Sequence, residues 1–350
     1  MSSIPEFLPW QLERASAWLN TRERFAHAWL IHGLAGIGKR QFALAAAAGL
    51  LCESPRQGLA CGHCAACQWI ASGNHPDLRR IRPDAIAVEE GSESAEEPPE
   101  GVAIAKKAPS KEIRVDQLRA LNSWFNTATH RGGWRVAVLY PAEALNPISA
   151  NALLKVLEEP PEHTVFLVVA DAPDNLLPTL VSRCRRLPLS VPPAGQSVEW
   201  LATQGIAEAD LWLAAAGGAP LRALQLAQGG DSACPDWLER FVTPLAQGHS
   251  PDIGALADAL EKQTATVWID SLQRLCVDLL LAATGAPVRY FPGLENKILV
   301  TAQRASLRNL AEAGKWLAQQ RAIASHPLNA KLLTHTTLQR IALACSPATH

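Results

Sequence analysis

The stretch "HGLAGIGKRQ", residues 32–41, decides the fold class of this chain. It follows the apolar run "HAWLIHG" and precedes "RQFALAAAAGLLC", a segment rich in residues that favour helices. A glycine-rich loop between a strand and a helix is the context of the phosphate-binding pattern GxxxxGK[ST], in which backbone amides surround phosphate oxygens. Gly33, Gly38 and Lys39 match this pattern, and Gly36 lies inside the loop. We therefore predict a nucleotide-type α/β domain.

In this sequence, both residues that contact a magnesium ion in working phosphate-binding loops are replaced. Arg40 stands where a serine or threonine hydroxyl binds Mg²⁺. The second contact is an aspartate at the end of a neighbouring strand, but "VAVLYPAEALN" has Tyr140 and Pro141 there. Glu143 lies beyond the strand end and is interpreted as a solvated side chain. The sequence predicts a loop that does not support hydrolysis, and it leaves open whether ATP or ADP binds.

Arg40 itself suggests a hypothesis about nucleotide binding. Its guanidinium group is expected near the position that Mg²⁺ takes in active sites, where a positive charge would allow nucleotide to bind without metal. On this hypothesis, binding of nucleotide does not depend strictly on Mg²⁺.

Alternating strands and helices continue to about residue 188. "WRVAVLY" and "HTVFLVVA" are predicted as buried strands, whereas "IRVDQLRALNSWFNTA" and "ISANALLKVLEEPP" have helical patterns. This alternation predicts a mostly parallel sheet. The acidic segment of about residues 82–111, which includes "EEGSESAEEPPEG", is predicted to be a long, flexible, exposed loop without assigned chemistry.

Beyond residue 188 the signal for strands nearly disappears. The sequence predicts an α/β domain over residues 1–188, a small helical lid domain over residues 189–231 and an all-α domain over residues 232–350. A chain of 350 residues with 48% hydrophobic content is large enough for more than one core.

Four cysteines are grouped in "CESPRQGLACGHCAAC", residues 52–67. Their spacing predicts that Cys52, Cys61, Cys64 and Cys67 hold a structural, tetrahedral Zn²⁺ ion. Iron–sulfur ligation is a competing interpretation. The ferredoxin pattern, however, continues to a fourth cysteine followed by proline, whereas Cys67 is followed here by "QWIASG". Ordinary reduced thiols are the remaining alternative, and His63 is a spare nitrogen donor within the group.

The charge and the apolar segments exclude several classes of protein. Lys and Arg total 32 against 33 Asp and Glu, so the chain lacks the broad basic field of a protein that binds DNA strongly by itself. The N-terminus does not resemble a secretory signal, and "FALAAAAGLLC" is too short to span a bilayer. We expect a soluble, cytoplasmic bacterial protein whose partners are mainly proteins and do not include a membrane.

Two further stretches carry a resemblance to a known family. "SANALLKVLEEPPEHTVFLVV" and "LLPTLVSRCRRL" resemble the AAA+ clamp-loader subunits, and the four-cysteine insert is similar to that of the bacterial members. The resemblance is most specific over residues 25–188. With both metal contacts replaced and "SRC" intact, the chain resembles best a member that does not hydrolyse ATP. The resemblance implies an AAA+ fold with a zinc module, a lid and a C-terminal oligomerisation (collar) domain.

The resemblance also implies a role in DNA replication. Clamp loaders are five-part rings that use ATP to open a sliding clamp and close it around primer-template DNA. The implied partners are subunits of the gamma/tau and delta types, with the clamp and the DNA contacted through the complex. By this resemblance Arg183, in the "SRC" stretch, is the arginine finger offered in trans to the ATP of a neighbouring subunit. Without the resemblance, Arg183 is interpreted as a surface arginine.

Two positions depart from the active relatives. "GAPLRAL" places Leu221 where these relatives have a nucleotide-sensing arginine, and Arg222 follows one residue later. Adjacent helical residues are rotated by about 100°, so Arg222 is expected to face elsewhere. Ala170 stands near the position of a polar sensor at a strand end.

Two other functions remain in competition. An active AAA+ motor of the gamma/tau kind would need another metal ligand in place of those lost at residues 40, 140 and 141. A zinc-dependent DNA-binding module would need a basic, aromatic-interleaved surface, which the near-neutral composition does not favour.

Overall fold

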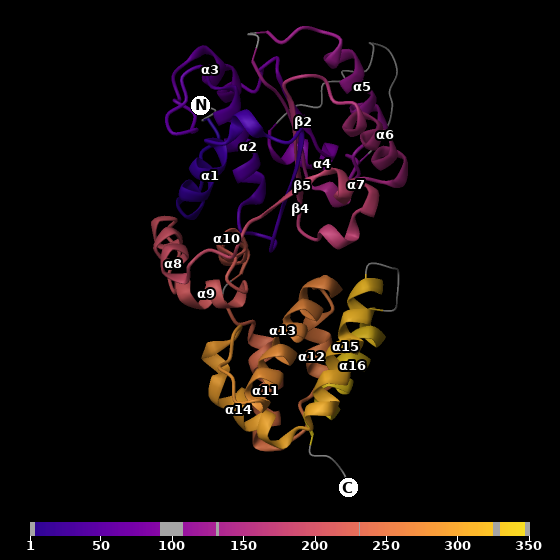
Figure 1. Ribbon diagram of the computed structural model, residues 1–350. Helices are drawn as coiled ribbons and strands as arrows, with labels where there is room; N and C mark the ends of the chain where they lie inside the picture. Colours follow the sequence, from indigo (N-terminus) through magenta and orange to yellow (C-terminus); the bar gives the residue numbers. More distant parts are fainter. Residues whose placement is uncertain (1–3, 92–107, 131–132, 231, 325–329, 347–350) are drawn as a thin grey trace, which may run out of the picture. The chain divides into compact units, whose positions relative to one another are not determined.

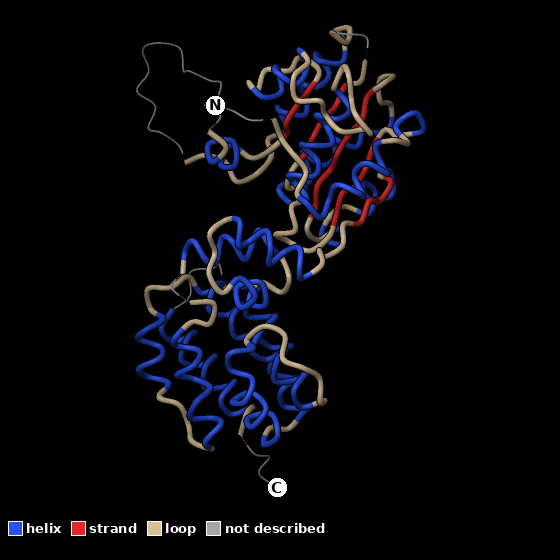
Figure 2. Tube along the Cα trace, turned by 90° about the vertical axis from the view of Figure 1, so that its left-hand side faces the viewer, coloured by secondary structure: helices blue, strands red, loops and turns tan. Residues whose placement is uncertain are grey.

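The computed structural model describes residues 4–91, 108–130, 133–230, 232–324 and 330–346 (Figure 1). The chain divides into two compact units, Met1–Gln196 and Ser197–His350. The strands are gathered in one of these units, and the other is helical (Figure 2). None of the described helices combines the length and the apolar character needed to cross a membrane.

The first unit contains a five-stranded parallel sheet in the order β2-β3-β4-β1-β5. The strands are β1 (Ala28–His32), β2 (Leu78–Ile81), β3 (Arg135–Leu139), β4 (Thr164–Ala170) and β5 (Arg185–Pro188). Because β3 and β4 are buried along their whole length, they are almost continuously apolar, as is usual for strands covered on both faces. The predicted parallel α/β core is confirmed.

The two edge strands were not predicted from the sequence. β2 reads "LRRI" and β5 reads "RRLP", and each has a single buried residue. An edge strand is paired on one side only and needs few apolar side chains, so its sequence carries a weak strand signal.

Helices cover both faces of this sheet. The helices of the first unit are α1 (Leu12–Leu19), α2 (Lys39–Leu51), α3 (Ala65–Ala71), α4 (Asp84–Glu89), α5 (Val115–Phe125), α6 (Pro147–Glu158) and α7 (Pro178–Arg183). Alternate residues of β1 point to opposite faces. Leu30 joins a core with residues of α5, α6 and α7, whereas Trp29 stacks edge-on against Trp18 of α1.

The segment predicted as a flexible loop needs a correction. Helix α4 lies within its first part, and Glu90 directly after it is mostly buried, with its side chain 15% exposed. Ion pairs of Glu90 with arginines near β2 hold this part against the sheet, which composition alone does not reveal. Residues 92–107 of the predicted loop lie outside the described residues.

The second unit consists of helices with two separate apolar clusters. They are α8 (Ala194–Thr203, which begins before the division), α9 (Ala209–Ala215), α10 (Pro220–Gly229), α11 (Asp236–Gln247), α12 (Ile253–Leu260), α13 (Ala265–Ala283), α14 (Glu295–Arg304), α15 (Leu307–Ile323) and α16 (Ala330–Ala344). The first cluster joins α8, α9 and α10 around Leu201 and Trp212. The second joins α11 to α16 around Trp268.

Candidate functional site

The phosphate-type loop connects β1 to α2, as the sequence predicted. Gly36 and Gly38 have φ angles of 82° and 92°, in the left-handed region that favours glycine. A Cβ atom on Gly38 would lie 2.4 Å from Leu8 Cδ1, and one on Gly33 would lie 2.3 Å from the Leu189 carbonyl oxygen. The glycines are therefore required by backbone conformation and by close packing.

Lys39 is engaged within the chain. Its ammonium group donates to the Leu34 carbonyl oxygen at 2.6 Å and pairs with the Asp171 carboxylate at 2.6 Å. The Lys39 side chain is 3% exposed, whereas that of Asp171 is 56% exposed. An internal carboxylate thus contacts the amine that binds terminal phosphates in active loops. Asp171 directly follows Ala170, so the end of β4 does carry a polar side chain, one residue beyond the position considered in the sequence.

Glu143 is not the solvated side chain that the sequence suggested. It lies in the short 3₁₀ helix η3 (Ala142–Ala144) and is partly buried. Its Oε1 atom accepts hydrogen bonds from the backbone N–H groups of Asp171 at 2.6 Å and Ala172 at 2.8 Å. These N–H groups follow β4 and need an acceptor because the ladder has ended. Glu143 therefore joins the ends of β3 and β4.

The residues at the two lost metal contacts meet at one carboxylate. Arg40 Nη1 lies 3.4 Å from Glu90 Oε1, and the Tyr140 hydroxyl donates to both Glu90 oxygens at 2.9 and 3.0 Å. Arg82 Nε lies 2.8 Å from Glu90 Oε2. Burial raises the pKa of Tyr140, so its hydroxyl remains a donor. Glu90 was not singled out in the sequence because nothing in the acidic segment distinguishes it from its neighbours.

Residues near the N-terminus also contact the loop. The Trp10 indole N–H donates to the Ile37 carbonyl oxygen at 3.1 Å, and the Gln11 amide donates to the Gly38 carbonyl oxygen at 2.9 Å. A cavity of about 110 Å³ beside them is lined by these side chains and by residues 189–193. Ligand pockets usually measure about 300–1,000 Å³, so this cavity is small for a nucleotide.

The four predicted cysteine ligands are brought together. All four sulfur atoms lie within 4.8 Å of one another. The Cys52–Cys64 and Cys61–Cys67 sulfur pairs are each separated by 3.9 Å. A tetrahedral ion with metal–sulfur bonds of about 2.3 Å separates its sulfurs by about 3.8 Å, so the spacing suits one metal ion. His63 is exposed and contacts the Cys61 carbonyl oxygen, outside this sulfur cluster.

The cysteine cluster is supported by helices on both sides. Cys52 is the C-cap residue of α2, Cys64 is the N-cap residue of α3, and Cys67 lies within α3. The Cys61 backbone N–H donates to Cys52 Sγ at 3.2 Å. The backbone N–H of His63 lowers the pKa of Cys61 to about 6, whereas burial raises the pKa of Cys67. A bound cation would favour the thiolate form at every position, including the buried ones.

Arg183 ends α7 and is partly exposed. Its Nη2 atom pairs with Glu158 Oε1 at 2.6 Å, and its Nη1 donates to the Thr179 carbonyl oxygen at 2.9 Å. The Arg183 and Glu158 side chains are 36% and 50% exposed. The guanidinium group of the nearby Arg185 lies 5.1 Å from the centre of the Trp29 ring. Of these two arginines, Arg185 is held by stacking and Arg183 by polar contacts with exposed groups.

Arg222 of the second unit is paired with Asp270 of α13. Arg274 and Arg321 also contact this carboxylate, Arg321 at 3.2 Å. Arg222 therefore links α10 to α13 inside this unit.

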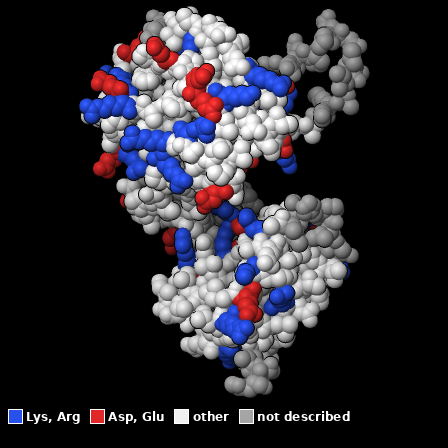
Figure 3. Space-filling view, turned by 45° about the vertical axis from the view of Figure 1, so that its right-hand side comes forward, with Lys and Arg blue, Asp and Glu red and all other residues white. Residues whose placement is uncertain are grey.

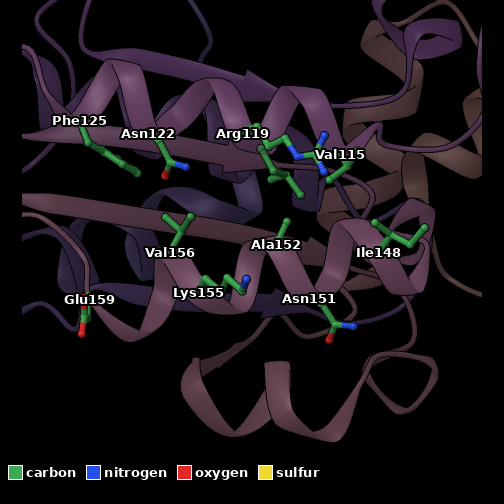
Figure 4. Close-up of a pocket in the computed structure, with 11 residues that line it drawn as sticks. Val115, Arg119, Asn122, Phe125, Ile148, Asn151, Ala152, Lys155, Val156 and Glu159 are labelled. Atoms are coloured by element: carbon green, nitrogen blue, oxygen red, sulfur yellow. The ribbon is translucent and has the colours of Figure 1, made fainter.

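A groove between α5 and α6 was not anticipated. Its volume is about 640 Å³, and side chains of the two helices face each other across it, with Arg119 on α5 and Lys155 on α6 (Figure 4). None of its lining residues belongs to the phosphate-type loop or to the cysteine cluster. On the face shown in Figure 3, several Lys and Arg side chains gather on the upper part of the view, with Asp and Glu side chains around them.

Comparison with known proteins gives the family. The pattern of the family described as "DNA polymerase III, delta subunit" matches residues 15–193. The DNA polymerase III subunit delta' of Pseudomonas aeruginosa is 42% identical over 227 residues, which cover 64% of this chain and 62% of that protein. The subunit delta' of Escherichia coli is 33% identical over 266 residues, or 74% of this chain and 71% of that protein.

A third relative belongs to a different subunit. The DNA polymerase III subunit tau of Escherichia coli is 34% identical over 161 residues, which cover 46% of this chain and 21% of that protein. The match to the delta' subunits is longer and includes a larger share of both chains. This chain belongs to the delta' family of DNA polymerase III clamp-loader subunits.

Proposed function

We propose that this chain is a non-hydrolysing subunit of the DNA polymerase III clamp loader. It helps to load the sliding clamp onto primed DNA and supplies Arg183 to the ATP site of a neighbouring subunit. The observation that carries the proposal is the state of the chain's own loop, where Arg40 and Tyr140, at both positions of the metal contacts, interact with Glu90.

The loss of metal contacts matters because of how phosphoryl transfer is catalysed. Positioning and electrostatic stabilisation provide almost all of the acceleration, and the metal ion neutralises charge that develops on the phosphates. Here Lys39 also has an internal carboxylate partner in Asp171. These contacts favour a site that does not turn over ATP.

Arg183 is suited to act on another subunit. A guanidinium group that stabilises transferring phosphate must be accessible and have spare donors. The Arg183 side chain is 36% exposed, and its ion pair is with a half-exposed carboxylate. Exposed ion pairs contribute about 0–1 kcal/mol to stability. Arg183 can therefore exchange its partner Glu158 for a phosphate group at little cost in free energy.

The cysteine cluster completes the proposal as a structural zinc site. Four thiolate ligands leave no open position for substrate, which distinguishes a structural site from a catalytic one. Cys52, Cys61, Cys64 and Cys67 would hold Zn²⁺ and thereby fix the end of α2 to the start of α3.

The partners follow from the family and remain part of the proposal. We infer that gamma/tau and delta subunits bind this chain, chiefly through the α11–α16 region as the collar domain. The sliding clamp and primer-template DNA are reached through the assembled complex in the bacterial cytoplasm.

The isolated full chain is expected to show no Mg²⁺-dependent ATP hydrolysis above background, because both metal contacts are absent. Steady-state release of phosphate measures this, with a purified tau or gamma subunit as the active control. Lys39→Ala is expected to leave the background rate unchanged. A clear Mg²⁺-dependent rate that disappears in Lys39→Ala would instead identify an active motor.

A further inference from the structure

The carboxylate of Glu90 is the meeting point of side chains from separate parts of the first unit. Arg82 Nε and Arg80 Nη1 lie 2.8 and 3.9 Å from its Oε2 atom, and Arg40 Nη1 lies 3.4 Å from its Oε1 atom. The Tyr140 hydroxyl donates to both oxygens. Arg40 comes from α2, Arg80 from β2 and Tyr140 from the end of β3, so the tertiary structure assembles this group.

The donor set suits oxyanions in general, phosphates as well as carboxylates. Guanidinium groups bind carboxylates and phosphates with the same planar, charge-assisted hydrogen bonds. Arg82 and Tyr140 are almost fully buried, whereas the Arg40 side chain is 53% exposed. The site therefore has a buried base of donors and an open side at Arg40, which a dissolved anion could reach.

We propose that Arg40, Arg80, Arg82 and Tyr140 form a binding site for phosphate-class anions, and that Glu90 of the same chain occupies it as an internal ligand. Arg40 directly follows Lys39 in the phosphate-type loop, and Tyr140 stands at the metal-contact position of the neighbouring strand. The site therefore adjoins the place of nucleotide phosphates. A carboxylate there repels phosphate oxygens, because both groups are negatively charged.

An internal carboxylate at Arg40 changes the reason for which the loop would be inactive. On the sequence hypothesis, Arg40 would help nucleotide to bind without Mg²⁺. In the structure the same guanidinium group already has an anionic partner. Exclusion of phosphate from this position is then electrostatic, and removing the Glu90 carboxylate is expected to relieve it, while Asp171 still contacts Lys39. Binding of an anion at this site does not depend on any role of Arg183.

The test uses the isolated full chain and inorganic pyrophosphate as the probe. Glu90→Ala and Glu90→Gln are compared with the wild type and with Glu89→Ala, which removes an exposed neighbouring carboxylate of α4. Thermal unfolding and isothermal titration calorimetry are measured without added divalent cations, with chloride at the same ionic strength as the reference. A parallel titration with ADP distinguishes a free inorganic anion from the phosphates of a nucleotide as the ligand. Equal affinities identify the anion itself as the ligand, and tighter binding of ADP identifies a nucleotide.

Without added pyrophosphate, Glu90→Ala is expected to unfold several degrees below the wild type, because the arginines lose this partner. Pyrophosphate should restore much of this loss and bind at least tenfold more tightly than to the wild type. Glu89→Ala should behave like the wild type. The double variant Glu90→Ala/Arg40→Ala should lose most of the response to pyrophosphate, since Arg40 provides the open side of the site.

The proposal is overturned if the Glu90 variants gain no affinity for pyrophosphate, or if Glu89→Ala gains the same affinity. It is also overturned if the gain persists without Arg40, because the anion then binds elsewhere. Should Glu90→Ala fail to fold, Glu90→Gln decides the matter, since its amide keeps the shape and removes the charge.

Discussion

Replacing Arg183 by alanine is expected to lower ATP hydrolysis at the neighbouring site by about 10³–10⁵-fold, the range for an arginine finger supplied in trans. The physical reason is that the guanidinium group neutralises charge on the phosphate in the transition state. The measurement is clamp- and DNA-stimulated hydrolysis by a clamp loader reconstituted with this chain. ATP sites of the complex that Arg183 does not serve should retain their rates of hydrolysis. The steady-state rate adds all sites together, so single-turnover experiments are better suited to resolve the loss at the one affected site.

The controls for Arg183 separate catalysis from assembly. Arg186→Ala removes another exposed arginine of the same stretch and should leave the rate unchanged. Arg183→Lys keeps the charge but loses the planar set of donors, so only partial activity is expected. Size-exclusion chromatography confirms that each complex assembles. An unchanged rate for Arg183→Ala in an intact complex would leave this chain with a scaffolding role or move the finger to another arginine.

Replacing all four clustered cysteines by serine is expected to abolish zinc binding and to unfold the segment of residues 52–67. Structural zinc contributes about 10–16 kcal/mol of apparent binding free energy in small zinc-finger peptides, so even a fraction of this is a large effect here. The wild type should contain about one zinc per chain by the four-ligand geometry. Atomic spectroscopy measures the metal, and limited proteolysis reports the unfolding of this segment.

The matched control is Cys234→Ser, a cysteine outside the cluster that is partly buried. It should retain zinc and resist proteolysis like the wild type. The first unit as a whole is expected to keep its sheet in the four-serine variant, because the strands do not depend on the cluster. Full thermal stability and unchanged proteolysis of that variant would rule out a structural metal.

The strands of the central sheet could be predicted from the sequence where burial dictates the residue type. β1, β3 and β4 are enclosed by helices, so their apolar runs were recognisable. The edge strands β2 and β5 and the short helix α4 were not recognised, because partial exposure relaxes the demand for apolar side chains. Local spacing also predicted the cysteine cluster, since all four ligands lie within residues 52–67.

The contacts of individual charged residues could not be predicted in the same way. Glu143 and Asp171 lie on segments that become neighbours only because β3 and β4 pair in the sheet. Likewise Arg40 and Glu90 are separated by fifty positions in the chain and belong to different elements. Long, polar side chains tolerate exposure, so their positions carry little signal until the fold defines their neighbours.

The sequence by itself determined the class of the fold, the cluster of four cysteines and the residue types at both magnesium-contact positions of the phosphate-binding pattern. Each of these depends on residue type at short spacing, through backbone conformation, ligand chemistry or burial. Only the tertiary structure decided which groups contact the residues of the phosphate-type loop and the neighbouring strand end: Asp171 at Lys39, and Glu90 at Arg40 and Tyr140. The reason is that charge interactions act through space, and the folded sheet brings these distant residues within a few ångströms.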